Sequence, residues 1–249
     1  MKRHKKPEEC TFTVEGYDVP VRIYREFRHT VRAAIGKDAA ILRLPISITP
    51  QEKEEQIERF RSWIGERARK RKGLLRRFEK IEYHNGDVVT VGKRSYVLMI
   101  SEENRKTHVA KLRDKDIIEI KLNQNDQEVN RHRSIQSLLS RVISADFLPE
   151  ISARVHSLNE QFFQQKIKIV RIKKTTSNWG SCSHNGAINL SSRLLFAPDD
   201  VIDYVIIHEL AHLVEFNHSP KFWRLLERAM PNYIEKEKWL IRFGEELGF

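Results

Sequence analysis

The chain has 249 residues, 40% of them hydrophobic, which is enough for one or two domains with their own cores. Its formal net charge is +11, so a polyanion or an acidic partner is possible, although such an excess can also serve solubility alone. Two distant cysteines, Cys10 and Cys182, exclude a disulfide scaffold. No apolar run reaches the ~20 residues of a membrane span and no apolar stretch follows the basic N-terminus, so we expect a cytoplasmic protein with no membrane partner.

The first half of the chain is predicted to be β-rich. Residues 1–10 are charged and are expected to form a disordered basic tail. Short β-branched segments follow, and Val21 and Ile23 alternate with polar neighbours as in a strand. Thr49 as N-cap and Pro50 at the first helical position then predict a helix.

A basic run between Arg67 and Arg77 closes this helix. It is either a patch for a nucleic acid or a nucleotide, or a solvated helix end where cations suit the helix dipole. Two hairpins are predicted next, over residues 88–100 and 109–122. We therefore expect a β-rich, basic N-terminal domain over residues 11–124.

The pattern changes in residues 125–249, which we expect to form a second domain. Helical spacing begins near Ile135, and after Pro149 it either continues or starts a second helix. Residues 166–172 alternate strictly and predict a strand. A hairpin is expected over residues 176–191, with its turn at 184–186.

The most informative stretch contains H-E-x-x-H, from His208 to His212. Two histidines four residues apart lie on one face of a helix, where both can bind a single zinc ion. Glu209 is then placed beside the metal, as general base towards a bound water. His218 is the candidate third ligand, and it requires the helix to end and the chain to turn back, with Asn217 able to support that turn in a left-handed conformation.

The alternative is that these histidines lie on a helix surface and bind no metal. The helix is apolar on most of its circumference, which predicts burial, and buried histidines with a buried glutamate need a partner. A metal would satisfy all of them, so the zinc site is the favoured interpretation. Cys182 and His184 are weaker candidates for ligands, because three histidines already complete a catalytic set.

Several segments together resemble the YgjP-like metallopeptidase family, which is related to SprT-like and WLM zincin-type domains. The segments are Trp179–Ser183, Asp203–Leu213, Asn217–Trp223 and Met230–Pro231. The resemblance implies an α+β protein with a zincin-like helical metal-binding domain and a β-hairpin. It also implies one zinc ion on His208, His212 and His218, with Glu209 as the catalytic base.

Three functions remain open at this point. A zinc metallopeptidase acting on a peptide or protein is favoured by the motif and the neighbouring hairpin. A zinc-dependent hydrolase of nucleotides or phosphate anhydrides is favoured by the positive charge, most of which precedes residue 166, but no Gly-rich phosphate loop accompanies it. A nucleic-acid-binding protein with a non-catalytic zinc is the third, although structural zinc sites normally have four protein ligands.

Overall fold

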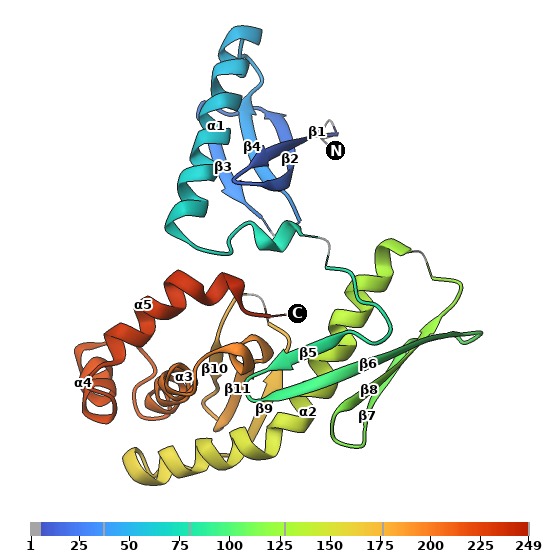
Figure 1. Cartoon of the computed structure of the whole chain (residues 1–249). Helices are drawn as coiled ribbons and strands as arrows, with labels where there is room; N and C mark the ends of the chain where they lie inside the picture. The colour runs from blue at the N-terminus through green and yellow to red at the C-terminus, as the bar shows by residue number, and fades with distance from the viewer. Residues whose placement is uncertain (1–5, 37, 80, 127, 176, 249) are drawn as a thin grey trace. The chain divides into compact units, whose positions relative to one another are not determined.

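The computed structural model describes residues 6–36, 38–79, 81–126, 128–175 and 177–248 (Figure 1). Helices and strands are both abundant, so the predicted α+β class is confirmed. The contacts divide the chain into two compact units. The first is Met1–Lys80 with Ile241–Glu246, and the second is Ile81–Leu240 with Leu247–Phe249.

The first unit is a four-stranded sheet with one long helix. The strands follow the order β1-β2-β4-β3, in which β2 and β4 are parallel and the outer pairs are antiparallel. Helix α1 contributes Phe60 and Ile64 to the core beneath this sheet. Thr49 and Glu52 form the capping box at the start of this helix, so the predicted N-cap role of Thr49 is confirmed. The elements are β1 (Glu8–Val14), β2 (Tyr17–Glu26), β3 (Arg32–Ile35), β4 (Ala40–Pro45), α1 (Pro50–Lys70) and η1 (Arg76–Phe78).

Two expectations about this unit need comment. Strand β1 begins at Glu8, inside the segment expected to be a disordered tail, because residues 8–14 pair with β2. Residues 1–5 of that expected tail lie outside the described part of the chain. Several cations of the basic run contact carboxylates, with Arg69 on Glu15 and both Arg71 and Arg77 on Glu245. These pairs partly neutralise the run.

The second unit begins with another four-stranded sheet. The two predicted hairpins are present as the antiparallel pairs β5–β6 and β7–β8. The parallel pairing of β6 with β8, which joins the hairpins in the order β5-β6-β8-β7, was not predicted. The strands are β5 (Val88–Val91), β6 (Arg94–Glu103), β7 (Val109–Arg113) and β8 (Ile117–Asn123).

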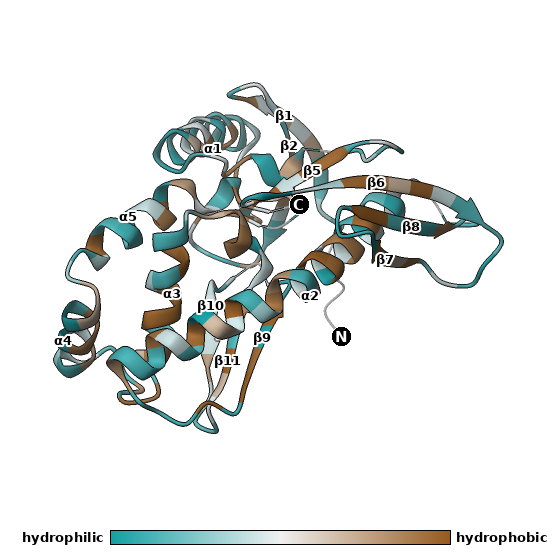
Figure 2. Ribbon diagram, turned by 60° about the horizontal axis from the view of Figure 1, so that its bottom comes forward, coloured by the Kyte–Doolittle hydropathy of each residue, from teal (hydrophilic) through white to brown (hydrophobic). Residues whose placement is uncertain are grey.

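Helix α2 (Glu128–Phe162) is continuous through Pro149, which resolves the alternative left open by the sequence. It runs along both sheets of the second unit, and its colour alternates between hydrophobic and hydrophilic along its length (Figure 2). Leu139 and Val155 belong to the same buried cluster as Ile118 of β8. The expected domain boundary lies between residues 124 and 125, whereas the observed boundary between the two units follows Lys80. The two boundaries differ because the apolar face of the β5–β8 sheet is buried against α2.

The rest of the second unit carries a three-stranded sheet and three helices. The sheet order is β10-β11-β9, with β10 antiparallel and β9 parallel to β11, so one side of β10 is an open edge. Among the described residues, no helix combines the length and apolar character needed to span a bilayer. The elements are β9 (Ile169–Lys173), β10 (Gly180–Cys182), β11 (Ala187–Ser191), η2 (Ser192–Phe196), α3 (Asp199–Ala211), α4 (Pro220–Ala229) and α5 (Tyr233–Phe243). The end of α5 from Ile241 onwards and η3 (Gly244–Glu246) belong to the first unit.

The first prediction concerns the polar contact that joins the β5–β8 sheet to α2. The buried Tyr96 hydroxyl donates to Asp146 Oδ2 at 2.6 Å, and Arg94 Nη1 donates to the same oxygen at 2.7 Å. In Asp146→Ala the tyrosine hydroxyl loses its acceptor, so the free energy of unfolding should fall by ~1–3 kcal/mol in urea denaturation. The double variant Tyr96→Phe/Asp146→Ala should recover part of this loss, and an unchanged midpoint for Asp146→Ala would contradict the assignment.

Candidate metal centre

Helix α3 is buried along most of its length. Val205, Ile206 and Leu210 are at most 3% exposed and belong to the main core. Asp199 and Asp200 occupy the first turn, where the helix dipole favours acids, and the helix ends at Ala211 with His212 as its C-cap. The predicted burial of this helix is confirmed.

The three histidines meet at the C-terminal end of α3. One ring nitrogen from each of His208, His212 and His218 lies within 4.8 Å of the others. The Nε2 atoms of His208 and His218 are 3.2 Å apart. Two nitrogens sharing a tetrahedral zinc at ~2.0–2.1 Å would be about 3.3 Å apart, so this pair already has the spacing that the metal requires.

A backbone contact orients the second histidine of the helix. Nδ1 of His212 is 3.2 Å from the carbonyl oxygen of Glu215. Because a carbonyl only accepts, this contact favours the tautomer with its proton on Nδ1 and leaves the Nε2 lone pair free for an ion. The donor set therefore fits a divalent metal, and zinc in particular.

Phe222 of α4 supports all three imidazoles. Its fully buried ring has its centroid 5.0, 4.5 and 4.8 Å from those of His208, His212 and His218. Trp223 stacks on the ring of His218 at 5.6 Å. Both aromatic residues belong to α4, and their contacts with the histidines arise only in the folded chain.

Burial differs among the site residues. Glu209 is 6% exposed, and this burial raises its pKa to about 8. His208 and His212 are half-buried rather than buried, and His218 is exposed. Burial lowers the pKa of His208 to about 4 and also lowers the pKa of His212, so both imidazoles are neutral at pH 7, as metal binding requires.

The chain turns back after α3 without the left-handed residue suggested from the sequence. Asn217 does not have a positive φ, so that expectation is wrong. Instead the amides of Leu213 and Val214 donate to carbonyls three residues earlier, which tightens the helix end. Ser219 then caps α4 by accepting from the amide of Phe222. His218 is thus fixed between two helix ends.

Strand β10 covers the carboxylate of Glu209. A Cβ atom on Gly180 would lie only 2.6 Å from Cγ and Oε1 of Glu209, so glycine is required for this close approach. Cys182 also faces this region. Burial and, to a smaller extent, the charge of the nearby Glu209 raise the pKa of its thiol to about 11. Neither Cys182 nor His184 belongs to the group of metal-binding atoms found in the described residues.

The open edge of β10 presents backbone groups beside Glu209. The Trp179 carbonyl accepts from Ser191 N at 2.8 Å, and Ser183 N donates to the Ala187 carbonyl at 3.0 Å. Since hydrogen-bonding residues alternate along an antiparallel pair, the N–H and C=O groups of Gly180 and Cys182 point away from β11. They are free to pair with another extended chain.

A second prediction tests the close contact at Gly180. Gly180→Ala places a methyl group against the Glu209 side chain, so either β10 or the glutamate must move. The expected cost is ~1–3 kcal/mol of unfolding free energy in urea denaturation, as for other overpacked interiors. Ser181→Ala is the matched control, because Ser181 is exposed on the other face of the strand. Equal stability of the two variants would contradict this contact.

A family model described as YgjP-like, metallopeptidase domain, matches residues 29–243. Among curated proteins, none matches the sequence. Two solved structures align with 36% of this chain and 90% of their own. They are the metallopeptidase zymogens abylysin of Pyrococcus abyssi (27% identity, TM-score 0.34) and jannalysin of Methanocaldococcus jannaschii (22% identity, TM-score 0.32).

The family match spans most of the chain. It contains β10, all of α3 and the loop that carries His218. The protein belongs to the YgjP-like metallopeptidase family.

Proposed function

We propose that the protein is a zinc-dependent peptidase with one zinc ion held by His208, His212 and His218 in a zincin-like arrangement. The observation that supports this most directly is the convergence of three imidazole nitrogens within 4.8 Å beside a nearly buried carboxylate. Three protein ligands leave a fourth position open for water, as in catalytic zinc sites.

Glu209 is the proposed catalytic base. Zinc, when bound, supplies a Lewis acid that lowers the pKa of a water molecule to about 7 and polarises a carbonyl. A cation held by the histidines would favour the ionised form of Glu209, whose pKa burial raises to about 8. The ionised Glu209 would then take the proton from the attacking water and later deliver it to the departing amine. Its buried position under Gly180 holds the carboxylate in one place and excludes competing solvent.

The open edge of β10 is the proposed backbone-binding element for a peptide. The outward N–H and C=O groups of Gly180 and Cys182 would add a substrate strand to the sheet, next to Glu209. This arrangement aligns an extended peptide with the general base, and it suits a peptide or protein substrate better than a nucleotide.

The alternative functions are separated by a direct turnover screen. The zinc-loaded protein should cleave peptides or casein and leave nucleoside triphosphates intact. A zinc-dependent nucleotide or phosphate-anhydride hydrolase would show the reverse. Binding to DNA tests a nucleic-acid role through its salt dependence, because phosphate contacts weaken steeply with salt.

The third prediction concerns metal content. His212→Ala or His218→Ala removes one of three proposed ligands, so each purified variant should lose most of its zinc in elemental analysis, whereas the unchanged protein should hold about one ion per chain. His156→Ala is the matched control, because His156 is an exposed histidine of α2 in the same unit. Full zinc content in both ligand variants would refute the assignment.

The fourth prediction separates chemistry from metal binding. Glu209→Gln keeps the shape of the side chain but cannot accept a proton, so turnover of a cleaved peptide should fall by ~10²–10⁴-fold while zinc content stays near one per chain. Glu160→Gln, at an exposed position of α2, should change neither quantity. If Glu209→Gln loses its zinc, the glutamate is a ligand and the proposed mechanism fails.

A further inference from the structure

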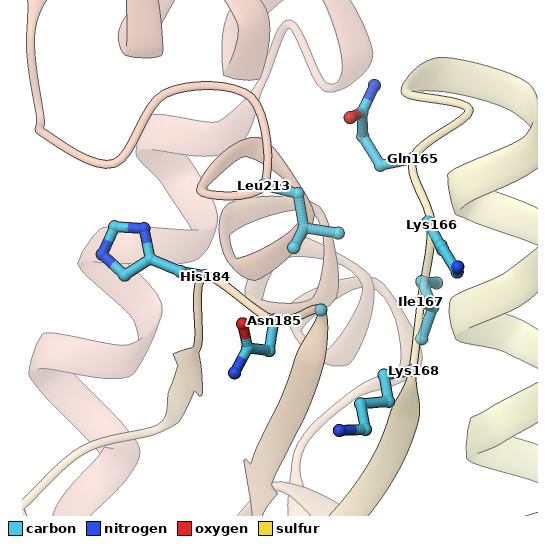
Figure 3. Close-up of a pocket in the computed structure, with 8 residues that line it drawn as sticks. Gln165, Lys166, Ile167, Lys168, His184, Asn185 and Leu213 are labelled. Carbon is cyan, nitrogen blue, oxygen red and sulfur yellow. The ribbon is translucent and has the colours of Figure 1, made fainter.

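A pocket and an apolar surface have no part in the mechanism proposed above. The pocket is formed by residues 165–168 and the turn between β10 and β11 (Figure 3). Strand β11 lies between the segment before β9 and the open edge of β10, so a peptide on that edge does not reach the lysines of the pocket. The apolar surface lies at one end of the sheet in the first unit.

The β5–β8 sheet of the second unit repeats the design of the β1–β4 sheet of the first (Figure 1). In both sheets a central parallel pair is flanked by two antiparallel pairs, in the orders β1-β2-β4-β3 and β5-β6-β8-β7. A long helix, α1 or α2, follows the fourth strand in each case. The register is also the same, because Val21 pairs with Ala40 where Leu98 pairs with Ile118. The two sheets can therefore be compared position by position.

An arrangement of ion pairs recurs at the same end of both sheets. In each, the carboxylate of the last residue of the second strand contacts one cation two residues later and another on the fourth strand. The two sets are Glu26 with Arg28 and Arg43, and Glu103 with Arg105 and Lys121. The two ends therefore have the same framework, and differences between their other side chains are not imposed by the fold.

The largest of these differences is an apolar cluster, which we call the apolar tip. Three positions beside the shared carboxylate are polar in the second unit and apolar in the first: the residue after the second strand, the residue before the third and the residue after the fourth. They are Asn104, His108 and Gln124 in the second unit, and Phe27, Val31 and Ile46 in the first.

The apolar tip is exposed to solvent. The exposed fractions are 84% for Phe27, 39% for Val31 and 46% for Ile46. Ile46 lies beside Phe27, because its amide donates to the carbonyl of Glu26 at 2.9 Å. Within the described residues up to Glu79, no other large hydrophobic side chain is exposed. Exposed apolar side chains that gather at one place, where the fold accepts polar ones, mark an interaction site.

Arginines surround the apolar tip. Arg25 and Arg32 are exposed, and neither is in an ion pair with another residue that the structure describes. Arg25 stands where the equivalent strand of the second unit has Glu102. Residues 1–80 carry 21 Lys and Arg against 12 Asp and Glu, so the surroundings of the tip also favour an acidic partner.

The side chains of the tip favour a protein over other acidic partners. Phe27 could stack on a nucleic-acid base, but Val31 and Ile46 are aliphatic and have no ring for such stacking. An apolar centre with an aromatic residue and a rim that contains arginine is the composition of protein–protein interfaces. A second copy of this chain is a poor partner, because each copy has a formal net charge of +11.

We infer that the apolar tip is a docking site for an acidic protein, which covers Phe27 with an apolar side chain and pairs its carboxylates with Arg25 and Arg32. That this protein is a substrate rests on the proposed peptidase function. Docking adds binding energy outside the catalytic centre, so it lowers the KM of a protein substrate and leaves a short peptide unaffected.

The kinetic test compares casein, an extended acidic protein, with a short peptide as substrates of the zinc-loaded protein. Phe27→Asn/Val31→His/Ile46→Gln gives the tip the residues of the second unit, which this backbone already accommodates, so the fold should be kept. In this tip variant the KM for casein should rise about tenfold with kcat unchanged, whereas kcat/KM for the peptide should stay the same.

The matched control is Val88→Asn/Met99→Gln, which removes two exposed apolar side chains of the second unit and should change neither substrate's kinetics. Unchanged casein kinetics in the tip variant would overturn the docking site and leave the peptidase function intact.

A binding measurement separates docking from catalysis. Fluorescein-labelled casein should bind the zinc-loaded Glu209→Gln protein, and its affinity should fall about tenfold when the tip substitutions or Arg25→Glu/Arg32→Glu are added. Such binding, with no cleavage of casein or peptides by the unchanged protein, would support the docking site and overturn the peptidase function. Binding of a single-stranded oligonucleotide or of phosphatidylserine vesicles that depends on the tip, without binding of casein, would overturn the inference.

Discussion

A carboxylate buried on an apolar helix is the constraint on which the rest of the second unit depends. Glu209 lies on α3 between core residues, and only close cover by β10 keeps its side chain from water. That cover requires a residue without a Cβ at position 180. The same burial raises the pKa of Glu209, the residue after His208, to about 8.

Helix α2 supplies the other support for α3. Arg154 of α2 donates to both carboxylate oxygens of Asp203 at 2.5 and 2.9 Å and to Asp199 Oδ1 at 3.0 Å. These charge-assisted bonds tie the N-terminal half of α3 to α2, and the bond from Arg154 lowers the pKa of Asp199. The C-terminal half, which carries the histidines, is supported instead by Phe222 of α4. One end of α3 is thus held by ion pairs and the other by aromatic packing.

The short hairpin of β10 and β11 takes part in two features of the proposed site. Gly180 covers the proposed general base, and the outer backbone groups of β10 are available for a substrate strand. These features lie in one rigid element because β11 is paired on both sides, with β10 and with β9. A change in the hairpin would therefore affect the proposed base and the strand pairing together.

The sequence alone determined the local features whose signals are short-range. H-E-x-x-H places two histidines on one helical face, Thr49 caps the helix that follows it, and the two hairpins of the β5–β8 sheet follow from alternation between turns. Tertiary structure decided what depends on contacts between distant segments: the parallel pairing of β6 with β8, the joining of residues 81–124 to the unit of the metal helix, and the cover of Glu209 by Gly180. Spacing along the chain fixes the face of a helix on which a side chain lies, whereas the neighbour that covers it is chosen by the packing of the whole core.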